Sequence, residues 1–291
     1  SGENLALAGL FAFGTVYWFS AVQGTVWFAA HVVGAALACI YVYASIDAAH
    51  PLVAGLCLCL GFATRTPLGF AFPFFAYEAW RASRSHDRPL ARLAQRGILF
   101  AAPAAFVLAL LLWHNRARFG DAFEFGHRYL TIVWRGRIEK WGLFSYHYLG
   151  RNLAVVLTNL PFTRTQGAPF QINVHGLALW LTTPLYAWAL WPKRTGATFW
   201  ALAATALAVA APSLLYQNSG WIQFGYRFSN DFAPFLFVMI ALGARRFSPP
   251  FWILAAWSIA VNLFGAATFD RTEAARFYFV DGSQKILHQP D

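Results

Sequence analysis

Length, composition and charge together exclude a soluble globular fold for this chain. Hydrophobic residues occupy 58% of its 291 positions and charged residues only 12%, against about 25% charged residues in soluble domains. Too few polar side chains are present to cover a water-facing surface, so the composition indicates a chain surrounded by a lipid bilayer. The net charge of +10 does not predict nucleic-acid binding, because the basic residues form short blocks between apolar runs.

Nine apolar runs follow one another along the chain, at residues 5–21, 26–46, 51–63, 67–80, 97–113, 176–191, 197–216, 232–244 and 251–269. Several are shorter than the roughly 20 residues of a full span, which favours tilted or partial spans. Thr66 precedes a proline and so disfavours helix, which predicts two short helices around it. We expect an all-α, polytopic helical bundle of about nine short transmembrane helices in a single transmembrane domain, 1–291.

Three short basic loops orient these helices. One holds the arginines between 81 and 96, and the others are Lys193-Arg194 and Arg245-Arg246. The positive-inside rule places all three in the cytoplasm. The helix count then puts the N-terminus inside and the tail from Asp270 outside.

The segment 115–175 falls on the outer side and is rich in aromatic and basic residues. Such residues suit the membrane–water interface, and also sugar stacking and phosphate binding. Within it, residues 148–160 are predicted to form an interfacial or short spanning helix.

Arg65 follows a short apolar run at the outer side. A guanidinium at membrane depth is costly and usually functional, so we expect Arg65 to bind a lipid-linked phosphate. The alternative is that Arg65 snorkels to the interface or pairs with a carboxylate.

The segment 119–129 contains Asp121, Glu124, Arg128 and Tyr129. If it is helical, Glu124 and Arg128 lie four residues apart and can pair. A carboxylate beside an arginine stays ionised and can act as a base, although two glycines favour turns. The alternative is a solvated amphipathic segment.

The segment 225–231 contains Tyr226, Arg227 and Asp231 at the outer rim of a late helix. Helix capping accounts for Asp231. It does not account for Tyr226 and Arg227, which are candidate ligand-binding residues. His31 and His114 are expected to be polar residues that line the bundle.

Cys39, Cys57 and Cys59 lie inside apolar runs and show neither zinc nor disulfide spacing, so no metal site is expected. The sequence contains no GxSxG, HExxH, P-loop or GxGxxG motif. No soluble-enzyme chemistry is therefore predicted.

The segments 14–28, 54–67, 119–129 and 225–235 together resemble bacterial membrane glycosyltransferases of the GT-C superfamily, whose best-known groups are the protein mannosyltransferases and aminoarabinose transferases. The resemblance implies a polyprenyl-phosphate-linked sugar as donor, used on the outer face of the bacterial inner membrane, with no cofactor certain. It implies phosphate contacts for Arg65 and Arg227. Arg128, Tyr129, Tyr226 and Asp231 are further candidate substrate-binding residues.

The family's catalytic acid lies in the first outer loop, but no acidic residue occurs between Ala21 and Val26. We therefore expect that the family's N-terminal helices precede this sequence, or that it is not an active transferase. If the upstream acid is absent, Asp121 or Glu124 could act as base.

Three functions remain open. The first is transfer of a sugar to an acceptor lipid, glycan or protein. The second is transport or flipping of a lipid-linked substrate, which charged residues at the rims and the lack of a repeat disfavour. The third is a non-catalytic membrane subunit.

Overall fold

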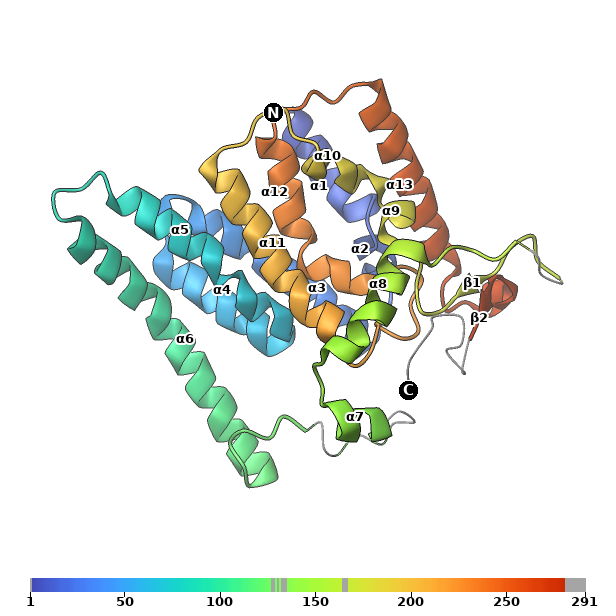
Figure 1. Cartoon of the computed structure of the whole chain (residues 1–291), viewed down its shortest axis with the longest axis horizontal. Coiled ribbons are helices and arrows are strands. Elements are labelled where there is room, and N and C mark those ends of the chain that lie inside the picture. Colours follow the sequence, from blue (N-terminus) through green and yellow to red (C-terminus); the bar gives the residue numbers. More distant parts are fainter. Residues whose placement is uncertain (1, 127–128, 130, 132–134, 164–166, 281–291) are drawn as a thin grey trace.

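The structure is a computed structural model that describes residues 2–126, 129, 131, 135–163 and 167–280. It is all-α (Figure 1). The helices of the first half are α1 (Gly2–Phe13), α2 (Tyr17–Ala21), α3 (Val26–Ser45), η1 (Ile46–Ala48), α4 (Pro51–Thr64), η2 (Thr66–Ala71), α5 (Phe72–Ser83) and α6 (Pro89–Phe119). Those that follow are α7 (Arg135–Trp141), η4 (Tyr146–Tyr148), α8 (Leu149–Thr158), α9 (Leu179–Thr182), η5 (Pro184–Tyr186), α10 (Ala187–Leu190), α11 (Ala197–Leu215), η6 (Arg227–Asp231), α12 (Ala233–Leu242), α13 (Pro249–Thr268) and η7 (Thr272–Phe277). Strands β1 (Ile172–Asn173) and β2 (Tyr278–Phe279) pair in parallel.

Four helices are long and apolar enough to cross a membrane: α3 with η1, α6, α11 and α13. Three shorter apolar helices, α1, α4 and α12, accompany them. The expectation of a helical membrane protein is confirmed to this extent. Nine transmembrane helices are not confirmed, because the other apolar runs do not form helices of spanning length.

Breaks inside the apolar runs have local causes. Arg65 is extended, with φ −141° and ψ 98°, and it separates α4 from η2. The predicted break between short helices is confirmed, but the extended residue is Arg65, and Thr66 begins η2. The run 176–191 is divided at Thr183, which is non-helical before Pro184, with φ −142° and ψ 64°, and separates α9 from η5. The run 5–21 is divided between α1 and α2 near Gly14.

Hydrogen bonds hold the broken helices against α3. The Tyr41 hydroxyl donates to the Ala71 carbonyl at 2.6 Å and accepts from the Phe75 N–H at 3.1 Å. It thereby supplies partners to backbone groups at the junction of η2 and α5, where a helix start leaves N–H groups unpaired. The same contact fixes α5 beside α3.

The predicted helix over 148–160 is confirmed as α8. Asn152 on its buried face donates to the carbonyls of Leu214 and Tyr216, both at 2.8 Å. Both carbonyls lie at the C-terminal end of α11, where a helix leaves carbonyl groups without partners of its own. Asn152 of α8 therefore caps the end of α11.

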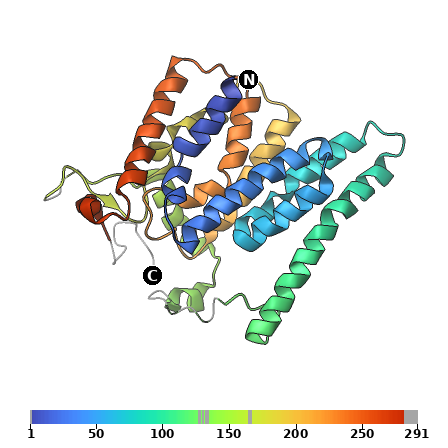
Figure 2. The same ribbon diagram turned by 180° about the vertical axis from the view of Figure 1, so that it is seen from behind.

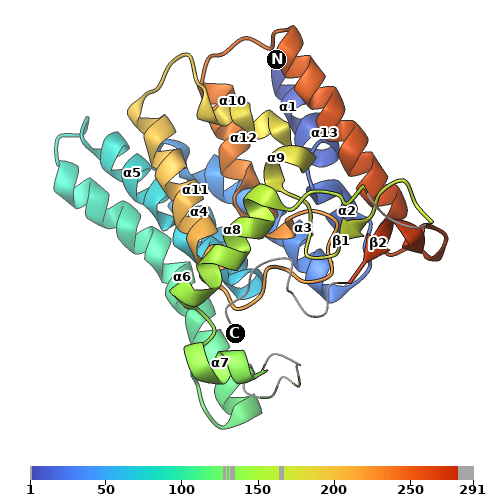
Figure 3. The same cartoon turned by 45° about the vertical axis from the view of Figure 1, so that its right-hand side comes forward.

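The three basic loops lie at one end of the bundle. In Figures 1, 2 and 3 the N-terminus and the loops α5–α6, α10–α11 and α12–α13 all lie at the upper end. Two of these loops are joined directly, since the Lys193 N–H donates to the Gly243 carbonyl at 2.8 Å. Helices α7 and α8 and both strands lie at the lower end.

Candidate functional site

An ion pair joins two distant parts of the chain at the lower end of the bundle. Arg65 donates from Nε to Asp231 Oδ1 at 3.0 Å and from Nη2 to Oδ2 at 2.7 Å. The break after α4 turns Arg65 toward η6, where Asp231 is 1% exposed. This two-point geometry is the strongest that a guanidinium and a carboxylate form, so Asp231 holds Arg65 in one orientation.

The capping role predicted for Asp231 is wrong. The N-cap of α12 is Phe232, and no side chain caps this helix. Pro234 near the start of α12 lacks an N–H, which lowers the need for a cap. The Asp231 carboxylate is committed to Arg65 instead.

His31 on α3 completes the contact with Asp231. Its Nδ1 lies 3.3 Å from Asp231 Oδ1, and the side chain is fully buried. Among the described residues neither ring nitrogen of His31 meets the geometry of a hydrogen bond, so the approach of Nδ1 to Asp231 is a polar contact only. The sequence offered one signal for this residue, a lone histidine in an apolar run, and predicted only that it lines the bundle.

Arg227 lies beside this pair but is held differently. Its guanidinium carbon lies 4.8 Å from the centre of the Phe28 ring and 5.8 Å from that of Phe228. Its backbone N–H donates to Gln223 Oε1 at 3.0 Å. Within the described residues its Nε is buried without a hydrogen-bond partner, and no carboxylate lies within ion-pair distance of it.

The charges of this site do not cancel. We call Arg65, Arg227, Asp231 and His31 the arginine cluster. Burial opposes ionisation of Asp231, but the charge of Arg65 and the nearby His31 ring outweigh it and lower the pKa to about 2. Burial, with the charge of Arg65, lowers the pKa of Arg227 to about 10, so Arg227 is still a cation at neutral pH.

Arg65 and Arg227 bring two positive charges and Asp231 brings one negative charge, so the cluster carries one excess positive charge. An excess cation in a poorly hydrated place is costly, and a bound anion removes that cost. The arrangement therefore suits an anionic ligand.

Tyr226 lies in the core next to the cluster. It is 1% exposed, and its ring centre lies 5.7 Å from that of Phe228. Burial and the charge of Asp231 raise its pKa. The structure thus brings together four of the predicted site residues, Arg65, Tyr226, Arg227 and Asp231.

The predicted acids of the segment 119–129 lie elsewhere. Gly120 ends α6 with φ +77°, and the chain then forms turns rather than a helix. The Asp121 Oδ1 accepts from the Phe123 N–H at 2.9 Å, and the Glu124 Oε1 accepts from the Gly126 N–H at 2.7 Å. The segment after α6 lies beyond the bundle, apart from the lower ends of α3 and α12 (Figures 1 and 3).

The helical Glu124–Arg128 pair is therefore not provided by the described backbone, and Arg128 itself lies outside the described residues. Tyr129 is exposed and stacks on Phe119 at 5.3 Å. Neither Asp121 nor Tyr129 is brought to the arginine cluster by the contacts of the described residues.

A second polar group lies near the C-terminal end of α5 and contains an arginine that is paired with two carboxylates. Arg81 donates to Glu78 Oε2 at 2.6 Å and to Asp47 Oδ1 at 2.5 Å. The Asp47 N–H also donates to Glu78 at 2.8 Å. These contacts tie η1 to α5 and leave no excess positive charge, so their role is structural.

Within the described ranges, no three His, Cys, Asp or Glu side chains lie together as metal ligands would. Comparison with protein-family models, with curated proteins and with solved structures finds no match to this chain.

Proposed function

We propose that the chain is a membrane glycosyltransferase and that its arginine cluster binds the phosphate of a polyprenyl-phosphate-linked sugar donor. One observation carries the proposal. Arg227 is a cation at the rim of the bundle without a carboxylate partner in the described residues, whereas its neighbour Arg65 is held by Asp231.

The cluster is organised before any ligand arrives. The guanidinium carbons of Arg65 and Arg227 lie 5.0 Å and 5.8 Å from the centre of the same Phe228 ring. Arginine binds phosphate oxygens through its planar set of donors. Because both side chains are already held, little conformational freedom is lost on binding.

A small apolar hollow lies near the cluster, between α3, α4, η2 and α12. It has room for little more than one water molecule. Its lining includes Leu68, which packs with the Arg65 side chain against Gly34 on α3. The isoprenoid chain of a lipid phosphate bound at the cluster would therefore run outside this hollow, in the surrounding lipid.

The transfer reaction needs what the cluster supplies. The bond between the sugar C1 and the phosphate oxygen breaks, and its electron pair stays on the departing phosphate. The acceptor oxygen forms the new bond to C1 and loses its proton to a base. Arg227 and Arg65 would stabilise the charge that develops on the leaving phosphate.

The base of the reaction stays a prediction. Asp121 and Glu124 can act only if the segment after α6 approaches the cluster. Asp231 is less suited, because both of its oxygens accept hydrogen bonds from Arg65.

Native mass spectrometry of the detergent-purified protein tests the phosphate site. Wild type is expected to retain polyprenyl phosphate but not polyprenol, and Arg227→Gln is expected to bind polyprenyl phosphate at least about tenfold more weakly, since a charged hydrogen bond contributes ~1.5–3 kcal/mol. Arg246→Gln is the matched control, because Arg246 is exposed in the basic loop at the other end. Equal binding by wild type and Arg227→Gln would refute the site.

An assay of sugar transfer in proteoliposomes distinguishes the three possible functions, which are transferase, flippase and non-catalytic subunit. Labelled sugar that moves from the lipid donor to an acceptor supports the transferase. Lipid-linked sugar that crosses the bilayer unchanged favours a flippase. Binding without either process favours a non-catalytic subunit.

A further inference from the structure

Four arginines lie around the turn that joins α5 to α6. Arg84, Arg88, Arg92 and Arg96 stand four residues apart, and we call them the α5–α6 row. Arg84 follows the end of α5, and Arg88 directly precedes α6. Arg92 and Arg96 lie one turn apart on α6, so their side chains share one side of that helix. The row therefore crosses from one helix to the next at the upper end of the bundle (Figures 1 and 3).

Packing between α5 and α6 holds the two ends of this row together. The Phe75 and Phe100 rings stack with centroids 4.0 Å apart. Arg96 Nη1 donates to the Ser83 hydroxyl at 2.9 Å, which joins α6 to the last residue of α5. The two helices are thus fixed side by side where the row crosses between them, and its arginines stay near one another.

The α5–α6 row carries positive charge that the described residues do not neutralise. None of its four side chains lies within ion-pair distance of a carboxylate in the described part of the chain. Arg92 donates to the neutral Gln95 Oε1 at 2.7 Å. Asp87 is the one acidic residue within the row, so the row has a net charge of +3. The net charge is still +2 when the neighbouring ion-paired group is included, which consists of Arg81, Asp47 and Glu78.

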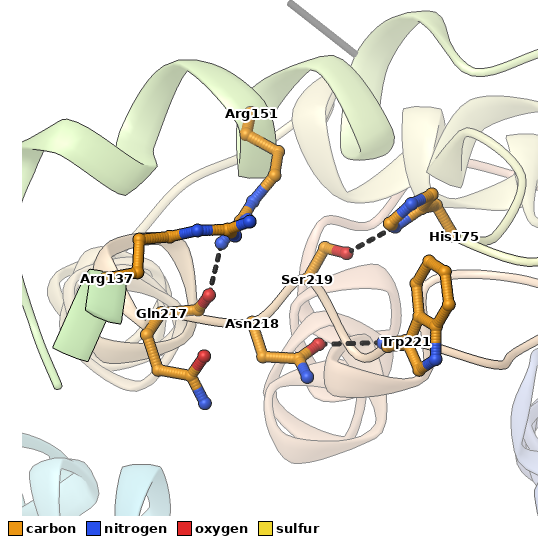
Figure 4. Close-up of a pocket in the computed structure, with 7 residues that line it drawn as sticks. All are labelled: Arg137, Arg151, His175, Gln217, Asn218, Ser219 and Trp221. Carbon is orange, nitrogen blue, oxygen red and sulfur yellow. Dashed lines mark hydrogen bonds between the residues drawn. The ribbon is translucent and has the colours of Figure 1, made fainter. Parts of the chain in front are cut away.

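An arginine at the lower end of the bundle shows the contrast with an internally bound guanidinium group. Arg151 on α8 is 2% exposed and donates to the Gln217 carbonyl (Figure 4). In the α5–α6 row, Arg84, Arg88 and Arg92 are exposed. Their guanidinium groups are therefore accessible to a partner outside the chain.

Apolar side chains border the row and indicate the kind of partner. Trp80 is 47% exposed, and the guanidinium carbon of Arg84 lies 4.7 Å from the centre of its ring. Leu90 and Ile98 on α6 are 79% and 68% exposed. Lipid covers such apolar side chains, and tryptophan beside a basic residue suits the level of the lipid headgroups. A lipid therefore fits this surface better than a soluble acidic protein, which would leave the apolar side chains unmatched.

We propose that the α5–α6 row binds the headgroups of anionic phospholipids. Arg84, Arg88 and Arg92 contact phosphate oxygens through their planar sets of donors, and Leu90 and Ile98 contact the acyl chains. An anionic lipid neutralises the excess charge of the row, whereas a zwitterionic lipid balances its phosphate with its own amine. This surface and the arginine cluster lie at opposite ends of the bundle, so the inference does not depend on the proposed transferase function.

Native mass spectrometry of the detergent-purified, delipidated full chain tests this proposal. Phosphatidylglycerol and phosphatidylethanolamine with identical acyl chains are added in separate titrations. Wild type is expected to bind phosphatidylglycerol at least about fivefold more tightly, since each basic residue near an anionic lipid surface strengthens binding by about that factor.

The double variant Arg88→Gln/Arg92→Gln is expected to weaken phosphatidylglycerol binding at least about fivefold and to leave phosphatidylethanolamine binding unchanged. Arg88→Lys/Arg92→Lys keeps the charge and should keep the preference for phosphatidylglycerol. Arg271→Gln/Arg276→Gln is the matched control, because it removes two exposed arginines at the other end of the bundle. It should leave the binding of both lipids unchanged.

Three results would overturn the proposal. The first is equal affinity of wild type for the two lipids. The second is an equal effect of the two double Gln variants on phosphatidylglycerol binding. The third is loss of phosphatidylglycerol binding in Arg227→Gln but not in Arg88→Gln/Arg92→Gln, which would assign the lipid to the arginine cluster.

Competition distinguishes a lipid from other anionic partners of this surface. Neither glycerol 3-phosphate nor soluble polyglutamate is expected to displace phosphatidylglycerol, because both lack acyl chains. Displacement by polyglutamate would indicate a soluble acidic protein as partner, and displacement by glycerol 3-phosphate would indicate a site for free phosphate esters. Either displacement would overturn the assignment to a lipid.

Discussion

At the scale of single residues, the environment of each arginine decides its role. Arg81 contacts two carboxylates and ties two helices together. Arg65 contacts one, and Arg227 lies against aromatic rings without an acidic partner in the described part of the chain. The same side chain is thus a structural tie in one place and a candidate anion ligand in another, because the local sum of charges differs.

Asp231→Asn is expected to destabilise the protein strongly. Removing one partner of a buried ion pair leaves the other charge uncompensated, at a cost of about 3–5 kcal/mol when both are fully buried. Because the Arg65 side chain is 18% exposed, we expect a value at or below the lower end. Thermal unfolding in detergent measures it. Asp121→Asn is the control, since Asp121 is exposed and asparagine forms the same turn. Equal unfolding midpoints would show that the ion pair does not stabilise the fold.

The same ion pair predicts a pH dependence. The folded pKa of Asp231, about 2, lies below the ~3.9 of an unfolded chain. A lowered carboxyl pKa stabilises the folded state above the unfolded pKa, and this contribution is lost as pH falls from about 4 to about 2. The stability difference between wild type and Asp231→Asn should therefore shrink over that range. A difference independent of pH between 6 and 2 would contradict the assignment.

At the scale of elements, small residues let helices approach closely. A Cβ at Gly55 on α4 would lie 1.9 Å from the Phe100 carbonyl oxygen on α6. Helix packing in membranes depends on such small residues, since lipid offers helices no hydrophobic drive to associate. The contact between α4 and α6 therefore depends on this glycine.

Gly55→Ala and Gly97→Ala form a matched pair that tests this contact. Alanine favours helix over glycine by ~1 kcal/mol, and a Cβ at Gly97 meets nothing within 4 Å. Gly97→Ala should leave the unfolding midpoint unchanged or raise it. Gly55→Ala should lower it, because backbone atoms of the two helices must separate. Similar midpoints for both variants would show that α6 does not depend on this close approach.

At the scale of the whole molecule, the three basic loops and the arginine cluster lie at opposite ends of the bundle. The N-terminus and three basic loops lie at one end (Figures 1 and 2). The arginine cluster lies toward the other end. By the positive-inside rule, we propose that the loops face the cytoplasm and the cluster faces outward.

Cysteine labelling tests this orientation. In a variant with Cys39, Cys57 and Cys59 replaced by alanine, Thr272→Cys should react with an impermeant maleimide in intact cells. Ser85→Cys should react only after the membrane is opened. Both positions are exposed, so reactivity reports the side of the membrane. The reverse pattern would invert the topology.

Several features followed from the sequence alone. The membrane helices, the break before Pro67, α8 and the grouping of the basic loops all depend on apolar content, local backbone preference and charge position. Each of these acts over a few neighbouring residues or over whole-chain composition. Local sequence therefore predicts them. It does not predict that the apolar runs 5–21 and 176–191 are divided into shorter helices near Gly14 and Pro184.

Only the tertiary structure decided the sites. Arg65 meets Asp231 across 166 residues, and His31 joins them from a third helix. Local sequence predicts a helix cap for Asp231, because it cannot show that a distant cation competes for the carboxylate. Helix packing decided that competition, and it also left Arg227 with the excess charge on which the proposed function rests.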